Sequence, residues 1–207
     1  FLLGSLARFE RDQFTWKAHS SQILHKKNMR LASNLFHVGI ILLFLGHFFG
    51  MLTPPEILHA LGISASAKQL LAVVAGSIFG LMCFAGLTML VRRRLTEPRI
   101  RATSSRMDIV ILLLLYVQLI LGLLTVPLSL MHLDGHNMLN LMSWARNVVT
   151  FDPMEAVAAV GDIGFLFKLH MVLGMSIFLV FPFSRLVHIW SAPVTYPARP
   201  YQIVRQR

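Results

Sequence analysis

The sequence has 207 residues, of which 56% are hydrophobic and only 14% are charged, a composition too apolar for a water-soluble globular domain. Its formal net charge of +10 would suit a nucleic-acid-binding protein, but the basic residues cluster between apolar runs, as in membrane proteins. We therefore expect no nucleic-acid partner. The single cysteine, Cys83, excludes a disulfide framework and a thiolate metal site, and the lack of a CxxCH motif excludes covalently attached haem.

Long apolar runs set the expected architecture. Residues 1–7, FLLGSLA, are too short to cross a bilayer, and we interpret them as the end of a further helix. Later runs that reach the ~20 residues needed for a membrane span are 33–52, 68–91, 108–130 and 163–189. These runs predict an all-α, polytopic transmembrane helical bundle of four complete helices plus the end of a fifth, N-terminal helix. Residues 1–207 are expected to form a single membrane-embedded domain.

The basic residues lie on one side of these spans. Sixteen of the nineteen Lys and Arg residues fall in three segments, 1–32, 92–107 and 185–207. By the positive-inside rule these segments, including the C-terminal tail 190–207, are cytoplasmic, and the other connections face outward. Membrane lipid is the expected partner of the apolar surface.

The long outward connection, 131–162, contains the segment NMLNLMSWARNVV at 137–149. Its apolar residues recur at roughly helical spacing. The pattern is compatible with an amphipathic helix on the membrane surface and equally with a partly ordered loop.

Histidines within the spans are the most informative residues. His37 and His47 lie on the first complete span, and His170 and His188 lie on the last. Ionisable side chains are rare in hydrocarbon because an unsatisfied polar group there costs several kcal/mol. A single such histidine is more often a hydrogen-bonded packing residue, but two on each of two helices favour metal ligation. A neutral imidazole offers one lone pair, which an axial bond to haem iron uses fully.

The spacing of these histidines predicts how they pair. Ten residues rise ~15 Å along a helix and eighteen rise ~27 Å, and the first and last spans are expected to be antiparallel. His37 would then meet His188 toward the cytoplasm, and His47 would meet His170 toward the outside. Two non-covalent, bis-histidine b-type haems could be held in this way, with helix tilt and a bend at Pro182 absorbing the unequal rises.

Two basic residues near these histidines could bind the propionates of a haem. Lys168 precedes His170 by two residues, and Arg185 precedes His188 by three. Haem propionates need cationic or hydrogen-bonding partners when partly buried. At the end of a span, the alternative is that the side chain extends to the lipid headgroups.

Several stretches resemble the gamma subunit of membrane-bound respiratory nitrate reductase. They include NLFHVG, GHFFGMLTP, RATSSRMDI, GLLTVP, FKLHMVLGM and FLVFPFSRLVHIW, and the likeness covers nearly the whole chain. The resemblance implies a multi-pass dihaem cytochrome b of a bacterial or archaeal cell membrane, with its C-terminus in the cytoplasm. Its haem ligands would be His37, His47, His170 and His188, paired as above.

The resemblance also implies an activity. The subunit would oxidise quinol near the outer face and pass electrons through the two haems to a cytoplasmic iron–sulfur subunit. That subunit would supply a molybdenum-containing catalytic subunit, where nitrate is reduced. For quinol contact we single out Lys68, a lone cation at the outer end of the second complete span, which could donate a hydrogen bond to a quinone oxygen. The alternative for Lys68 is a membrane anchor.

Two other functions remain open at this stage. One is the dihaem b subunit of another quinone-linked reductase complex, which only the soluble partners would distinguish. The other, of a different class, is a non-redox transporter with a histidine relay, although such proteins commonly have pseudo-symmetric halves and broken helices.

Overall fold

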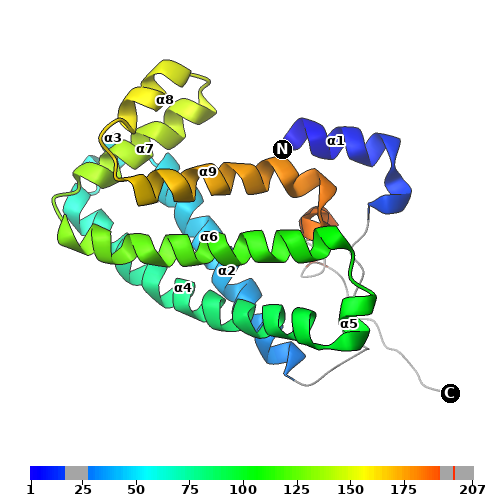
Figure 1. Cartoon of the computed structure of the whole chain (residues 1–207). Helices are drawn as coiled ribbons and strands as arrows, with labels where there is room; N and C mark the ends of the chain where they lie inside the picture. The colour runs from blue at the N-terminus through cyan, green and yellow to red at the C-terminus, as the bar shows by residue number, and fades with distance from the viewer. Residues whose placement is uncertain (17–27, 192–197, 199–207) are drawn as a thin grey trace.

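In the computed structural model, which describes residues 1–16, 28–191 and 198, the chain is helical and these residues contain no strand (Figure 1). The elements are α1 (Leu2–Arg11), η1 (Gln13–Thr15), α2 (Met29–Leu52), α3 (Pro55–Ala60), α4 (Ala65–Thr96), α5 (Pro98–Ala102), α6 (Arg106–Met131), α7 (His136–Val149), α8 (Pro153–Ala159), α9 (Phe165–Val180), η2 (Phe181–Phe183) and η3 (Arg185–Ser191). Most of the tail 190–207, including our interpretation of it as cytoplasmic, lies outside the described residues.

The predicted number of spans is confirmed, although the last span is shorter than predicted. Among the described residues, α2, α4, α6 and the segment Phe165–Phe183 are long and apolar enough to cross a membrane. The all-α, polytopic helical bundle is therefore the observed fold class. Two spans start earlier than hydropathy indicates because side chains cap them: Ser64 accepts a hydrogen bond from the Ala67 amide, and Ser105 forms a capping box with Asp108.

Short helices occupy the two ends of the bundle. Helices α3, α7 and α8 lie together at one end, called here the α7 end, and α5 lies at the other, called the α5 end (Figure 1). The segment 137–149 is a helix, α7, with Met142 fully buried, so the loop alternative is wrong. Helix α7 packs against the ends of α2 and α4 and against α8.

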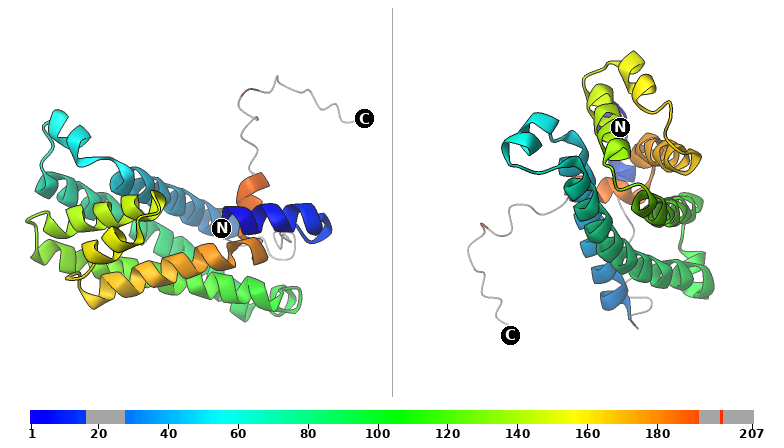
Figure 2. Two further views of the ribbon diagram at one scale, coloured as in Figure 1. Left: turned by 90° about the horizontal axis from the view of Figure 1, so that it is seen from above. Right: turned by 90° about the vertical axis from the view of Figure 1, so that its left-hand side faces the viewer.

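The long helices pack in sequence order. Helix α2 packs against α4, α4 against α6, and α6 against α9, with Cys83, Leu87 and Leu119 in the buried core. Helices α2 and α9 are not among the closely packed pairs of the described residues. Figure 2 shows the row from the α7 end: it curves so that its first and last members face each other. The site described below lies between these two members.

Two glycines allow α2 and α4 to cross closely. A Cβ on Gly39 would lie 2.7 Å from Cys83 Cβ, and a Cβ on Gly86 would lie 2.4 Å from the backbone nitrogen of Phe36. Both distances are shorter than real carbon contacts, so only glycine permits this approach of the two backbones.

The prediction of one continuous helix over 163–189 is wrong. The α-helix ends at Val180, and the chain continues as η2 and then η3, which carries His188. Pro182 has no amide hydrogen and cannot extend the α-helical ladder. The carbonyl of Pro182 instead accepts a hydrogen bond from the Arg8 guanidinium on α1. His170 and His188 are consequently not on one helix face, and the expected bend at Pro182 is a complete change of helix type.

The close crossing of α2 and α4 at Gly86 leads to a prediction. Gly86→Ala should separate α2 from α4 and lower the free energy of unfolding by about 1–3 kcal/mol, the usual cost of overpacking. The measurement is thermal unfolding of the detergent-purified protein. Gly76→Ala, on the same helix with no atom within 4 Å of the added carbon, is the matched control and should unfold like the wild type. Equal stability of both variants would contradict the close crossing.

Candidate functional site

Helix α2 carries two histidines, His37 and His47, whose Nδ1 atoms are hydrogen-bonded to backbone carbonyls. His37 Nδ1 lies 2.8 Å from the Ser33 carbonyl oxygen, and His47 Nδ1 lies 2.8 Å from the Leu43 carbonyl oxygen. Both partners are four residues earlier on the helix. When Nδ1 carries the hydrogen and donates it, Nε2 is the unprotonated nitrogen with a free lone pair. Both side chains are exposed within the isolated chain, so this lone pair is accessible.

The ring of His188, on η3, faces the ring of His37, on α2. The two ring centres are 6.4 Å apart and the ring planes meet at 75°. His188 Nδ1 lies 2.6 Å from the Arg185 carbonyl oxygen, which again leaves Nε2 as the available nitrogen. His188 reaches this position on η3, after the α-helix has ended at Val180.

His170 faces His47 in the second pair. Their ring centres are 6.3 Å apart and the planes are inclined by 39°. His170 comes from α9, and its Nδ1 is buried with no hydrogen-bond partner. The Gln118 amide nitrogen on α6 lies 3.3 Å from His170 Nε2 and donates to the His170 carbonyl oxygen at 3.0 Å. The structure thus brings together the pairs that the sequence predicted.

The distance between the ring centres of each histidine pair matches the distance expected for two imidazoles that bind the same metal ion. Metal–imidazole bonds are ~2.0 Å long, so two imidazoles on opposite sides of an ion have ring centres about 6 Å apart. Within the described chain no group of three or more His, Cys, Asp or Glu side chains could hold a metal. Two imidazoles alone leave most of an ion's coordination positions to a non-protein ligand, and a porphyrin supplies four such nitrogens. The four histidines therefore fit haem.

Space next to His47 supports this fit. A Cβ added to Gly46 or Gly50 would meet no atom within 4 Å. Gly39, by contrast, belongs to the crossing with α4, and Gly174 lies against Gln118. Of these four glycines, Gly46 and Gly50 therefore leave room beside the imidazoles.

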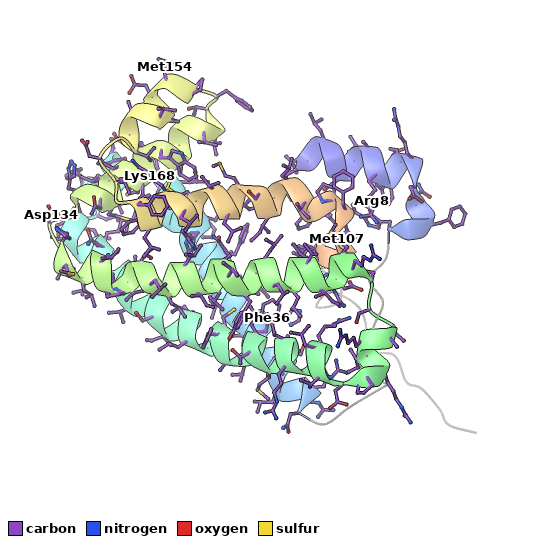
Figure 3. The ribbon with its side chains drawn as sticks, in the orientation of Figure 1. Arg8, Phe36, Met107, Asp134, Met154 and Lys168 are labelled. Atoms are coloured by element: carbon purple, nitrogen blue, oxygen red, sulfur yellow. The ribbon has the colours of Figure 1, made fainter. Side chains whose placement is uncertain are left out.

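Lys168 lies at the beginning of α9 (Figure 3) and has a local partner. Its ammonium donates to the Gly161 carbonyl oxygen at 2.8 Å and so closes the loop that precedes the helix. The suggested contact with a haem propionate remains a prediction.

Arg185 forms an ion pair that ties η3 to α6. Its Nη1 lies 3.8 Å from Asp108 Oδ1, and the other carboxylate oxygen of Asp108 accepts from the Ser105 amide at 3.1 Å. Asp108 was not singled out from the sequence. Arg185 lies three residues before His188, so its proposed role toward a propionate of the His37–His188 pair also remains a prediction.

Lys68 is buried beneath α7 rather than extended toward the membrane surface. Only 8% of the residue is exposed, and its Nζ lies 3.2 Å from the sulfur of Met142. A thioether is a weak acceptor, so the ammonium lacks a strong partner there. Arg146, one turn along α7 from Met142, is a second cation close to Lys68.

Sequence reasoning missed Gln118. The available signal was an amide in the otherwise apolar run LLLLYVQLILG, since polar side chains in a span commonly hydrogen-bond across helices. In the structure Gln118 is the polar residue of α6 that contacts a paired histidine.

Comparison with known proteins identifies the family. The family model for the nitrate reductase gamma subunit matches residues 1–207. The respiratory nitrate reductase 1 gamma chain of Escherichia coli (strain K12) is 52% identical over 207 residues, which cover 100% of this chain and 91% of that one. The respiratory nitrate reductase 2 gamma chain of the same organism is 50% identical with the same coverage.

A more distant relative agrees. The nitrate reductase gamma chain of Bacillus subtilis (strain 168) is 36% identical over 207 residues, covering 100% of this chain and 92% of that protein. The match extends over both paired-histidine sites and all the spans. The chain belongs to the nitrate reductase gamma subunit family and is a membrane subunit of an oxidoreductase complex.

Proposed function

We propose that this nitrate reductase gamma subunit oxidises quinol and delivers the electrons to the soluble part of its complex, with two b-type haems as resident cofactors. His37 and His188 would hold one haem, and His47 and His170 would hold the other. The observation that carries the proposal is the spacing of the pairs, 6.4 and 6.3 Å between ring centres, which join α2 to η3 and to α9.

The hydrogen bonds of the imidazoles suit them to this task. A haem with two imidazole ligands cycles between ferric and ferrous states and so carries one electron at a time. Carbonyl acceptors at Nδ1 of His37, His47 and His188 fix each ring, keep the lone pair on Nε2 and raise the basicity of the ligand. These rings can bind iron without reorganising their helices.

The distribution of charge supports an orientation. The arginines of 92–106 lie at the α5 end, which the positive-inside rule assigns to the cytoplasm. The tail 190–207 is then cytoplasmic as well. An iron–sulfur subunit and a molybdenum-containing subunit would dock at this end, near His37 and His188. Arg185 and Lys168 are our candidates for partners of the haem propionates at the two sites.

Quinol oxidation is placed at the α7 end, near His47 and His170. Electrons that enter there use both sites, whereas entry at the α5 end would leave His47 and His170 without a function. Lys68 is our candidate contact because, among the described residues, its buried ammonium has the weakly accepting sulfur of Met142 as its hydrogen-bond partner. A quinone oxygen is a better acceptor and would gain a charge-assisted hydrogen bond.

The test of the proposal is a reduced-minus-oxidised absorption spectrum of the purified complex with haem quantitation. Two b-type haems per gamma subunit are expected. A gamma subunit without haem, as a transporter with a histidine relay would be, refutes the proposal. Copurification of subunits other than those of nitrate reductase would favour a different quinone-linked complex.

The pairing leads to a prediction about ligand variants. His47→Ala and His170→Ala should each remove the same haem, and His37→Ala and His188→Ala should each remove the other, because a single imidazole does not hold the iron of a bis-histidine site. Low-spin haem signals in electron paramagnetic resonance spectra distinguish the two. Loss of one haem shared by His37→Ala and His47→Ala would contradict the pairing.

The helix break leads to a prediction about Pro182. Pro182→Leu restores the amide hydrogen that an α-helix needs, which should favour extension of α9 and move His188 away from His37. The haem of the His37–His188 pair should be lost and the other retained, as measured by haem spectra. Pro127→Leu is the control because Pro127 lies inside α6 without ending it, and both haems should remain in that variant.

Lys68 is tested by kinetics. Lys68→Ala should slow quinol oxidation roughly tenfold to a hundredfold, which corresponds to the ~1.5–3 kcal/mol of a hydrogen bond to a charged group. Both haems should remain, and an artificial donor that supplies electrons directly to the soluble subunits should support normal nitrate reduction. Wild-type quinol kinetics in Lys68→Ala would leave this residue a structural contact of α7.

A further inference from the structure

The chain that leads from α9 to His188 lies outside the α-helix. Helix α9 ends at Val180, and η2 and η3 occupy residues 181–191. The Phe181 carbonyl oxygen accepts hydrogen bonds from the amide and the hydroxyl of Ser184, at 3.1 and 2.9 Å. These bonds shape the turn between η2 and η3, but both partners belong to the turn itself. The place of η3 relative to α2 must therefore be set by contacts with other helices.

Helix α1 makes such a contact at Pro182, which is fully buried. The guanidinium of Arg8 donates to the Pro182 carbonyl oxygen (Figure 3). One turn earlier on α1, a Cβ added to Gly4 would lie 3.1 Å from Cγ of the proline ring. That distance is tighter than an ordinary carbon contact, so Gly4 lets the backbone of α1 approach the ring. One residue of η2 is thus held by a hydrogen bond and by close packing from the same helix.

Aromatic rings extend the contact beyond His188. Phe1, which immediately precedes α1, stacks on Trp190 with 5.4 Å between ring centres and 22° between the planes. The ring of Phe1 also packs edge-on against Phe181, at 4.6 Å. Pro182 precedes His188 by six residues, and Trp190 follows it by two. The N-terminal segment therefore contacts the chain on both sides of this histidine.

The side of α1 that contacts η2 is small and polar. The leucines of α1 are exposed, whereas Ser5 is buried and Gly4 and Arg8 are partly buried. Lipid covers leucine side chains as well as protein does, so the leucines specify no particular partner. A guanidinium that meets a backbone carbonyl does specify one, because a carbonyl without a donor is costly in a membrane. The contact is thus directed at the η2 backbone and is not general apolar packing.

We propose that α1 holds the segment that carries His188 in place, with Arg8 as the positioning residue of His188. The inference rests on the proposed function, in which His188 and His37 hold a haem. The ring centre of His188 lies 6.4 Å from that of His37, and the bond from Arg8 fixes the turn that leads to it. Arg185, whose Nη1 lies 3.8 Å from Asp108 Oδ1 on α6, ties the same segment to a second helix.

The effect of α1 should be confined to one haem. His47 and His170 lie on α2 and α9, before η2 begins. Their positions do not depend on how the chain continues after Val180. The haem of the His47–His170 pair therefore shows, in each variant, that the protein is folded and assembled.

The experiment is electron paramagnetic resonance of the low-spin haems in the complete complex in membranes. Arg8→Met keeps the aliphatic stem and removes the donor, and it should shift or abolish the signal of the haem that His37→Ala removes. Arg8→Lys keeps a donor and should restore that signal toward the wild-type spectrum. Arg11→Met alters an exposed arginine of the same helix and is the matched control, in which both signals should be unchanged.

Two further measurements make the test independent of one substitution and of haem. Gly4→Leu should push α1 away from the Pro182 ring and produce the same spectral change as Arg8→Met. Amide hydrogen exchange, followed by mass spectrometry of the detergent-purified complex, should be faster over residues 181–191 in Arg8→Met than in the wild type or in Arg11→Met.

Each outcome has a defined meaning. A shift or loss confined to the haem of His37 and His188 in Arg8→Met and Gly4→Leu supports the inference. Unchanged signals in both variants, equal effects on both haems, or faster exchange without a spectral change overturn it and leave the proposed function intact. An Arg8→Lys spectrum as altered as that of Arg8→Met overturns the role of Arg8 as a donor. A wild-type complex that contains no pair of b-type haems overturns the proposed function itself.

Discussion

The distance between α2 and α9 is the constraint on which the rest of the structure depends. Helix α2 meets α9 through the His47–His170 pair, at 6.3 Å between ring centres, and meets η3 through the His37–His188 pair, at 6.4 Å. Helices α2 and α9 do not otherwise pack closely. Their separation is therefore set indirectly, by the packing of α2 on α4, α4 on α6 and α6 on α9. Gly39 and Gly86 allow the first of these contacts to be closer than a residue with a Cβ would permit. A change in the distance between α2 and α4 at that crossing would also change the distances within both histidine pairs, although neither glycine touches a histidine ring.

Hydropathy and residue type were sufficient to predict most of the architecture. Apolar runs gave the spans because an uncharged stretch of ~20 residues has few alternatives to a membrane helix. The antiparallel arrangement of the first and last spans followed from counting the spans between them, and it correctly placed His37 opposite His188 and His47 opposite His170. These inferences need only the order of the spans along the chain, which can be read from the sequence.

The remaining features depend on contacts between distant residues. The segment after Val180 stays apolar, so hydropathy could not show that the α-helix ends there. Proline alone does not distinguish the two cases, because Pro127 lies within an unbroken helix whereas Pro182 lies within the 3-10 helix η2. The burial of Lys68 under α7 and the contact of Gln118 with His170 likewise required the helix packing. A lone polar residue in a span indicates that it has a hydrogen-bond partner but does not identify that partner.

The bond from Arg8 to the Pro182 carbonyl has a consequence for the order in which the fold is completed. Its two residues are 174 positions apart, so the contact closes a very long loop and cannot form until synthesis has passed η2. Before then, the Pro182 carbonyl lacks this donor, and an unpaired carbonyl is costly within a bilayer. Helix α1 is thus synthesised before the four spans but makes this contact only after them. The η2 turn that leads to η3 and His188 therefore receives its hydrogen bond from Arg8 late in synthesis.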